Sequence, residues 1–224
     1  MLEKNFVVGA FQCNCRLIDC PNTGDAALID PGDEAAKILK GLQGLTTPSG
    51  IPIQVKYLLH THGHLDHIGA TRPVYESFSE TEKPLIALHK GDEPLYKNLK
   101  MQGNLFGFKY DEPLSIQHYL EDGEIFQIGN LKMSVLHTPG HSPGSVCFHL
   151  HSDSGLKAPE VVFSGDTLFQ GSVGRTDLWG GDQDLMFKSI RQRLLILDTE
   201  TRVSPGHGAD SSIGIEKSQN PFLR

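Results

Sequence analysis

The chain has 224 residues, of which 38% are hydrophobic and 21% charged, and its formal net charge is −7. This composition is ordinary for a globular protein, and a chain of this length can bury a sizeable core. The acidic balance argues against nucleic acid as the main partner, because phosphate binding requires clustered Lys and Arg. The apolar stretch at the amino terminus is too short for a signal peptide or a membrane span. We therefore expect a cytoplasmic protein without a membrane partner.

Short apolar runs separated by turn residues predict strands in the first half of the chain, and helical periodicity separates them. The expected strands are 5–11, 14–20, 25–32, 53–60 and 84–89, and the expected helical segments are 33–42, 69–80 and 91–98. Asp33 is placed to cap the helix 33–42, and Gly44 is placed to end it. Residues 98–113 contain Gly, Asn and aromatic residues without a clean period, which favours a loop or lid.

The second half of the chain is again rich in strands. They are expected at 115–120, 124–128, 131–138, 145–151, 160–166 and 201–208, with a glycine-rich loop at 167–182 and a terminal tail at 213–224. A strong helix is predicted at 182–197. Asp182 would cap it, and its apolar face would carry Leu185, Met186, Ile190, Leu194 and Leu197. Two successive batches of strands and helices within 1–224 predict one α/β domain of layered sheets with helices outside.

Four of the 11 histidines lie in one stretch, HTHGHLDHIG, at 60–69. Histidine is the commonest metal ligand, and solvent exposure gives no reason for such crowding. Side chains two residues apart on an extended segment point the same way, so His62 and His64 can reach one ion. If the chain turns into a helix at Asp66 and His67, that pair is redirected to a neighbouring position. One loop can then serve two metals.

Three further candidate ligands follow strand ends at glycine-containing turns: His141 in HTPGHSPGS, Asp166 in VVFSGDTL and His207 in VSPGHGAD. The predicted metal sites are two sets that share Asp166 as a bridge, namely His62, His64 and His141, and Asp66, His67 and His207. Nitrogen and oxygen donors suit Zn²⁺, Fe²⁺ or Mn²⁺, and the absence of thiolates weakens a purely structural zinc interpretation. The other histidines are expected to be packed or at the surface without a metal: His60, His89, His118, His137, His149 and His151. The four cysteines are expected to be reduced and packed in or near strands.

The motifs THGHLDH, TPGHSPGS, FSGDTLF and SPGHG, in this order and spacing, resemble those of the metallo-β-lactamase superfamily. Within it, GDTLFQGSVGRTDLWGGD and the compact length resemble the short hydroxyacylglutathione hydrolases, which are glyoxalase II-type thioesterases. The resemblance covers nearly the whole chain, from ALIDPG to NPFL. It implies an αββα sandwich with the site along one edge. It also implies that Asp30, in LIDPG, supports the site from behind the ligands, although a turn aspartate before Pro-Gly is an equal alternative.

The activity implied by this resemblance is hydrolysis of a small thioester, such as S-D-lactoylglutathione, to D-lactate and glutathione. Two cations about 3.5–4 Å apart would hold a water and lower its pKa. Asp166 and Asp66 would orient the resulting hydroxide toward the scissile carbonyl. The expected cofactors are two divalent ions, zinc first and iron or manganese as alternatives. The oligomeric state is left open.

The motif set is much less specific for the substrate than for the superfamily. Longer family members hold glutathione with basic residues of an extra helical domain after the last histidine. Here only 17 residues follow His207, so we expect this glutathione subsite to be absent or built differently. Arg175 is the first candidate to meet a substrate carboxylate, with Lys109 and Tyr110 as weaker ones. The favoured alternative for Arg175 is an ion pair with Asp177.

Other functions are compatible with the same residues. A glutathione persulfide dioxygenase would use one iron held by two histidines and an aspartate, which this chain also contains. A lactonase or β-lactamase is less favoured because of the GRTD loop, and a nuclease because of the acidity. In a non-enzymatic alternative, the ions only stiffen a binding module.

Overall fold

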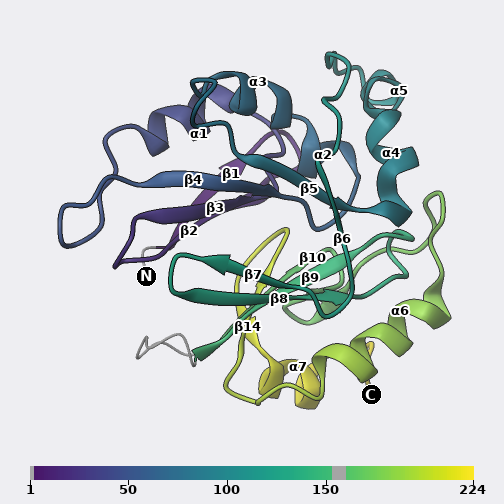
Figure 1. Cartoon of the computed structure of the whole chain (residues 1–224). Coiled ribbons are helices and arrows are strands. Elements are labelled where there is room, and N and C mark those ends of the chain that lie inside the picture. Colours follow the sequence, from purple (N-terminus) through teal and green to yellow (C-terminus); the bar gives the residue numbers. More distant parts are fainter. Residues whose placement is uncertain (1–2, 153–159) are drawn as a thin grey trace.

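The computed structural model describes residues 3–152 and 160–224. Two six-stranded sheets pack face to face, and helices cover the outer face of each sheet (Figure 1). The first half of the chain builds one sheet and its helices, and the second half builds the other. The expected αββα sandwich is confirmed, and it places the main core between the two sheets.

The first sheet has the strand order β1-β2-β3-β4-β5-β6. Strands β1 to β3 are antiparallel, and β3 to β6 are parallel. Its strands are β1 (Glu3–Val8), β2 (Cys13–Asp19), β3 (Asp25–Ile29), β4 (Gln54–Leu59), β5 (Leu85–His89) and β6 (His118–Leu120). The helical elements between them are α1 (Ala35–Leu42), α2 (Leu65–Ile68), α3 (Thr71–Glu76), η1 (Lys90–Asp92), α4 (Glu93–Lys97) and α5 (Leu99–Leu105). Ile38 of α1 and Val74 of α3 are fully buried against the outer face of this sheet.

The second sheet has the order β14-β13-β10-β9-β8-β7, and only the pair β10 and β13 is parallel. Its strands are β7 (Ile125–Ile128), β8 (Leu131–His137), β9 (Val146–Leu150), β10 (Val161–Gly165), β13 (Arg202–Pro205) and β14 (Ser211–Ser212). A small hairpin of β11 (Leu168–Phe169) and β12 (Ser172–Val173) follows β10. The helices are α6 (Gln183–Ser189), which continues into the π-helical turn η3 (Ile190–Leu194), and α7 (Ile213–Gln219). Met186, Ile190 and Ile213 bury these helices on the outer face.

The core between the sheets is built by alternate residues of the facing strands. Ile29 and Leu59 of the first sheet meet Phe148 and Phe163 of the second, and all four are at most 2% exposed. Alternation in a strand sends the intervening residues to the outer face, where the helices cover them. The sequence runs of apolar residues without clean alternation therefore mark strands that are buried on both faces.

Two segments that were predicted to be irregular contain helices. Within 98–113, α5 spans Leu99–Leu105, so the loop prediction is wrong for these residues, while a lid role for this segment stays a prediction. Leu99 and Gln102 are buried in α5, and such tertiary contacts leave no periodic signal in a short segment. The tail 213–224 begins with α7, and the hydroxyl of Ser212 caps it by accepting a hydrogen bond from the Ile215 N–H (3.3 Å).

Two helix details also differ from the prediction. Asp33 does not cap α1, because the helix starts at Ala35 after Glu34, which is in the left-handed region (φ 46°). The Glu34 carboxylate instead accepts a hydrogen bond from the Gly9 N–H (2.9 Å). Asp182 does cap α6, as predicted, by accepting from the Leu185 N–H (2.9 Å). Leu185 itself is 36% exposed, so it does not share the buried face.

No helix within residues 3–152 and 160–224 has both the length and the apolarity needed to cross a membrane.

Candidate metal centre

The histidine loop leaves β4 and turns into the short helix α2 at Leu65. His62, His64 and His67 are all buried, and their side chains turn toward the second sheet's loops. His60 is different: its Nδ1 lies 2.9 Å from the Ala87 carbonyl oxygen, and its Nε2 lies 2.8 Å from the Thr71 hydroxyl. His60 is therefore a packed residue that fixes the base of the loop, as predicted.

The other three candidate ligands each follow a strand of the second sheet. His141 lies in the turn after β8, Asp166 comes directly after β10, and His207 follows β13. Carbonyl oxygens orient the two imidazoles: His141 Nδ1 lies 2.8 Å from the Arg175 oxygen, and His207 Nδ1 lies 2.9 Å from the Phe11 oxygen. In both rings, the Nε2 atom is left to face the centre.

The first predicted donor set converges. His141 Nε2 lies 2.9 Å from His64 Nδ1 and 3.2 Å from His62 Nε2. Three imidazole nitrogens this close cannot all carry protons that point toward one another. All three can, however, donate lone pairs to a single cation. The structure thus brings His62, His64 and His141 together as the sequence predicts.

The second predicted set converges beside the first. His67 Nε2 lies 3.2 Å from His207 Nε2, and the Asp66 carboxylate lies 3.2 Å from the same His207 atom. Asp66 Oδ2 is 3.8 Å from His67 Nε2. Two nitrogens and one carboxylate oxygen surround a second position that suits a divalent cation.

Asp166 lies between the two sets. Its Oδ2 is 3.7 Å from His141 Nε2 and 3.6 Å from His207 Nε2. Its Oδ1 is buried and has no hydrogen-bond partner among the described residues, which is costly for a carboxylate oxygen in a protein interior. A cation on either side would satisfy this oxygen, so the residues present fit a metal.

The pKa values of the buried histidines shift in opposite directions on the two sides of the site. Burial, and then the neighbouring imidazoles, lower the pKa of His62 well below its usual value and that of His64 to about 3. Burial opposes protonation of His67 too, but Cys13 and the carboxylates of Asp166, Asp66 and Asp30 raise its pKa well above the usual value. His62 and His64 are therefore unprotonated at neutral pH, whereas His67 holds a proton that a metal must displace.

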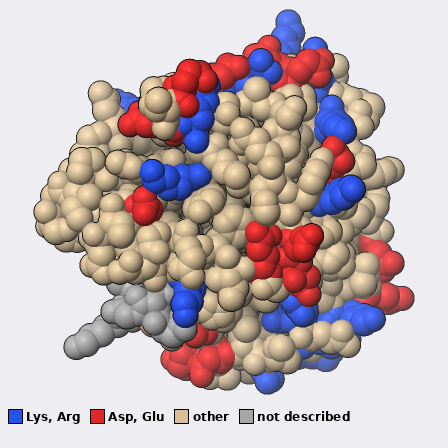
Figure 2. All heavy atoms as spheres, in the orientation of Figure 1, with Lys and Arg blue, Asp and Glu red and all other residues tan. Residues whose placement is uncertain are grey.

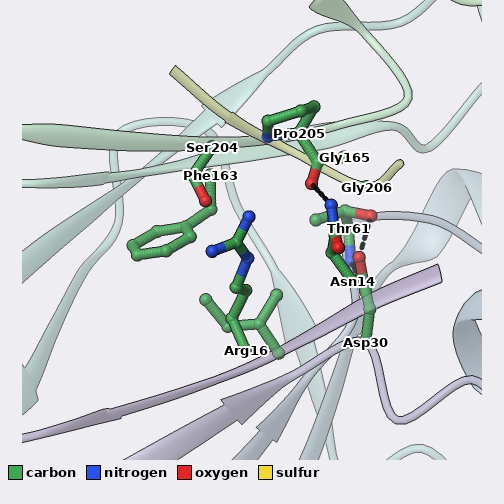
Figure 3. A pocket seen from close by; sticks show the side chains of 10 residues that line it. Asn14, Arg16, Asp30, Thr61, Phe163, Gly165, Ser204, Pro205 and Gly206 are labelled. Carbon is green, nitrogen blue, oxygen red and sulfur yellow. Dashed lines mark hydrogen bonds between the residues drawn. The ribbon is translucent and has the colours of Figure 1, made fainter. Parts of the chain in front are cut away.

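Asp30 supports the second set from behind. Its Oδ2 lies 2.9 Å from His67 Nδ1 and accepts a hydrogen bond from the Thr61 hydroxyl (2.7 Å), while its Oδ1 accepts from the Thr61 N–H (2.8 Å). Asp30 is held in the left-handed region (φ 52°), which Asp tolerates better than most residues. Figure 3 shows Asp30 and Thr61 side by side with the dashed bond between them. The contact favours the support role over a simple turn aspartate.

A small cavity lies behind this support, between the two sheets. It measures about 10 Å³, and Arg16, Phe163 and Ser204 line it together with Asp30 and Thr61 (Figure 3). A volume of this size admits about one water molecule and no organic substrate. A substrate must therefore approach the donors from the opposite side.

Sequence comparison places this geometry in a known family. A family model described as the metallo-beta-lactamase superfamily matches residues 8–207. The chain belongs to the metallo-beta-lactamase superfamily. The hydroxyacylglutathione hydrolase GloC of Haemophilus influenzae is 37% identical over 217 residues, which cover 96% of this chain and 95% of that protein.

Solved structures of this superfamily match nearly the whole chain. The structure of TTHA1623 in a di-iron-bound form is 40% identical, with a TM-score of 0.81, and covers 98% of this chain and 100% of its own. BLEG-1 B3 metallo-beta-lactamase is 34% identical, with a TM-score of 0.84, and covers 99% of both chains. The metallo-beta-lactamase fold implies divalent metal binding, and the described residues contain clusters of His and Asp side chains that could hold an ion.

Two residues that hold the metallo-beta-lactamase centre together were missed by the sequence analysis. Asp92 is buried and joins two ligand loops, because its carboxylate accepts hydrogen bonds from the Gly63 N–H (2.8 Å), the Ser142 hydroxyl (2.6 Å) and the Gly144 N–H (2.6 Å). Gln102 of α5 accepts from the Leu65 N–H (3.0 Å). Neither residue belongs to a motif, and each is a single polar residue in a short helical segment, so no sequence signal was available.

The three candidate substrate contacts lie in different surroundings. The Arg175 guanidinium donates to both carboxylate oxygens of Asp177 (2.7 and 2.8 Å), as the alternative interpretation predicted. Tyr110 packs closely against Gly69 and Gly103, so its ring braces α2 and α5. Lys109 is exposed. Substrate contact by these residues stays a prediction.

Proposed function

We propose that this protein is a dinuclear metal-dependent hydrolase that cleaves S-(2-hydroxyacyl)glutathione thioesters, such as S-D-lactoylglutathione, in the cytoplasm. The observation that carries the proposal is the position of Asp166, which lies within 3.7 Å of a histidine from each of two complete donor sets. The thioester is suggested by the 37% identity to a hydroxyacylglutathione hydrolase over nearly the full length of both chains.

We assign the donors as the sequence predicts. The first ion would be held by His62, His64 and His141, and the second by Asp66, His67 and His207, with Asp166 shared. Zinc is the proposed ion because imidazole and carboxylate donors suit it, and iron or manganese would fit the same set. Bound there, divalent cations supply the Lewis acidity that activates water and polarises a thioester carbonyl.

The protein's own residues then position the reacting groups. Burial raises the pKa of Asp66, but the imidazoles of His67 and His207 lower it below the usual range, so Asp66 is a carboxylate at neutral pH. Asp166 and Asp66 can accept hydrogen bonds from the attacking water and orient it toward the carbonyl carbon. Attack by an oriented water does not require a serine or cysteine nucleophile. Cys13, near His67, is fully buried, and burial raises the pKa of its thiol to about 12.

The open side of the centre carries an apolar rim. Phe11, which is 40% exposed, contacts the ring of Phe106 edge to face at 5.3 Å between centroids. Phe169 lies 6.3 Å from the His207 ring. A hollow of about 240 Å³ beside Arg175 lies next to the loop whose carbonyl holds His141. The rim can receive the apolar part of a thioester, and the hollow offers Arg175, Thr176 and Gln183 as polar side chains among apolar ones.

The face shown in Figure 2 gives no support for nucleic acid as a substrate. On the face shown in Figure 2, the described Lys and Arg side chains are scattered among Asp, Glu and neutral residues, without a continuous basic area. Nucleic-acid binding needs such an area, because its affinity comes largely from the phosphates.

The proposal is tested by counting metal and measuring thiol release from S-D-lactoylglutathione with the same protein. His62→Ala and Asp166→Ala should lose metal and turnover, whereas His118→Ala, which alters a half-exposed histidine paired with Glu124, should keep both. One iron per chain with oxygen uptake on glutathione persulfide would replace the hydrolase by a dioxygenase. Metal-dependent stabilisation without turnover of any substrate would leave a binding module.

A β-lactamase activity is the second candidate. It is favoured by the 34% identity to BLEG-1 B3 metallo-beta-lactamase over 99% of both chains. A chromogenic β-lactam and a lactone belong in the same assay. A kcat/KM for the β-lactam above that for the thioester would reverse the order of the two candidates.

A further inference from the structure

A second group of metal-binding side chains lies at the far end of the second sheet. His149 pairs with Ser134 of β8 on one side and with Val162 of β10 on the other. Leu150 points into the core between the sheets, so His149 and His151 both point to the outer face. Glu160, two residues before Val162, shares that face. From the sequence, both histidines were expected to be packed or at the surface and not bound to a metal.

The three side chains are already in contact range. His149 Nε2 lies 2.9 Å from a Glu160 carboxylate oxygen, and the two imidazole rings lie 4.5 Å apart between centroids. One ligand atom from each of the three residues lies within 4.8 Å of the others. His149 is nearly buried, while His151 and Glu160 are partly exposed, so an ion can reach the group from solvent.

This group is separate from the catalytic donors. Glu160 precedes β10 and Asp166 follows it, and a strand of that length spans roughly 17 Å. His149 and Asp166 therefore lie near opposite ends of the same pair of strands. An ion at one end has no ligand in common with an ion at the other.

We propose that His149, His151 and Glu160 form a binding site for a divalent cation of the zinc class. Two histidines in i and i+2 positions on a strand, with a carboxylate from the neighbouring strand, are a donor set that suits Zn²⁺ and leaves a coordination position for water. The Ser134 hydroxyl, 2.9 Å from His151 Nε2, helps to orient that ring. Lys132 is on the same face of β8, so this site should bind zinc more weakly than the catalytic centre.

Zinc at this site would connect the end of β9 to the start of β10. Because the three donors come together only in the folded sheet, binding stabilises the folded state and not the unfolded chain. The site therefore serves as a structural clip, and it is independent of the proposed thioesterase activity.

The experiment compares the metal-loaded wild type with His151→Ala and Glu160→Gln. Each protein is equilibrated by dialysis against micromolar zinc, and bound metal is counted by mass spectrometry. The wild type should hold one zinc per chain more than either variant. Its melting temperature should rise further with added zinc, whereas those of the variants should not.

His118→Ala provides the matched control, because His118 is also paired with one glutamate (2.6 Å) but belongs to no group of three possible metal ligands among the described residues. It should keep the additional zinc. Equal zinc content in the wild type and both variants would overturn the site, as would an equal loss in His118→Ala. Glu160→Gln preserves the shape of the side chain, so it decides the matter if His151→Ala fails to fold. Thioester turnover should be unchanged in both variants, which separates this test from that of the proposed function.

Discussion

Gly206 is the glycine at which one methyl group should disturb both carboxylate and imidazole donors. It precedes His207, and a Cβ built on it would lie 2.4 Å from Asp166 Oδ1 and 2.7 Å from His67 Cε1. Ordinary contacts begin at 3.4 Å, so in Gly206→Ala these atoms must move by about 1.0 and 0.7 Å. The backbone at Gly206 lies outside the left-handed region, so alanine is disfavoured there by the neighbouring donors and not by its own conformation.

The displacement of the donor atoms in Gly206→Ala allows the loss of catalytic rate to be estimated. Metal sites tolerate deviations of only about 0.2 Å in their ligand distances. A misplacement of 1 Å costs on the order of 10²-fold in catalysis. Gly206→Ala is therefore expected to lower kcat/KM for the thioester by about 100-fold and to weaken metal retention, with the fold preserved.

The assay measures kcat/KM, metal per chain and melting temperature for Gly206→Ala beside Gly214→Ala. Gly214 lies in α7, and its nearest neighbour to a new Cβ is the Thr199 oxygen at 3.1 Å, so this control adds a methyl group far from the donors. Gly214→Ala should retain activity and metal. Wild-type turnover and metal content in Gly206→Ala would refute the idea that the donors occupy the positions described.

Three further predictions follow from the same site. Asp30→Asn removes an acceptor that faces His67 and should weaken metal affinity about 10- to 100-fold in a chelator competition; unchanged affinity would contradict the support role. Because the pKa of His67 is raised, it carries a proton at neutral pH that zinc must displace, so zinc affinity should increase with pH. Calorimetry in buffers of different ionisation enthalpy measures this, and an absence of proton release at pH 7 would be incompatible with it. Phe11→Ala should raise KM for the thioester roughly three- to tenfold with little change in kcat, and an unaltered KM would exclude the aromatic rim from substrate binding.

The convergence of the donors was predictable because the sequence marks them in two ways. His141, Asp166 and His207 each follow a strand and lie in a turn that contains glycine, while the other candidates lie together in the one histidine-rich stretch. Strand ends are where a rigid sheet positions functional loops. The αββα layers were predictable from the alternation of strands and helices together with the motif resemblance.

The residues that brace the donors were not predictable. Asp92 and Gln102 act through hydrogen bonds to backbone groups of distant loops, and a chain read locally contains no sign of such contacts. The same reason explains the helix α5, which forms because Leu99 and Gln102 are buried against the histidine loop. Helix α1 starts after Glu34 instead of at the predicted cap Asp33, and the Glu34 carboxylate accepts a hydrogen bond from the distant Gly9 N–H. Tertiary contacts override local preference at each of these places.

Each donor set draws on both halves of the chain. His62 and His64 follow a strand of the first sheet, whereas His141 follows one of the second, and the pair His67 and His207 is divided in the same way. Neither half alone presents a full set of ligands. Tight metal binding should consequently occur late in folding, after the two sheets have packed against each other. Removal of the metal by a chelator should weaken the contact between the sheets before either sheet unfolds.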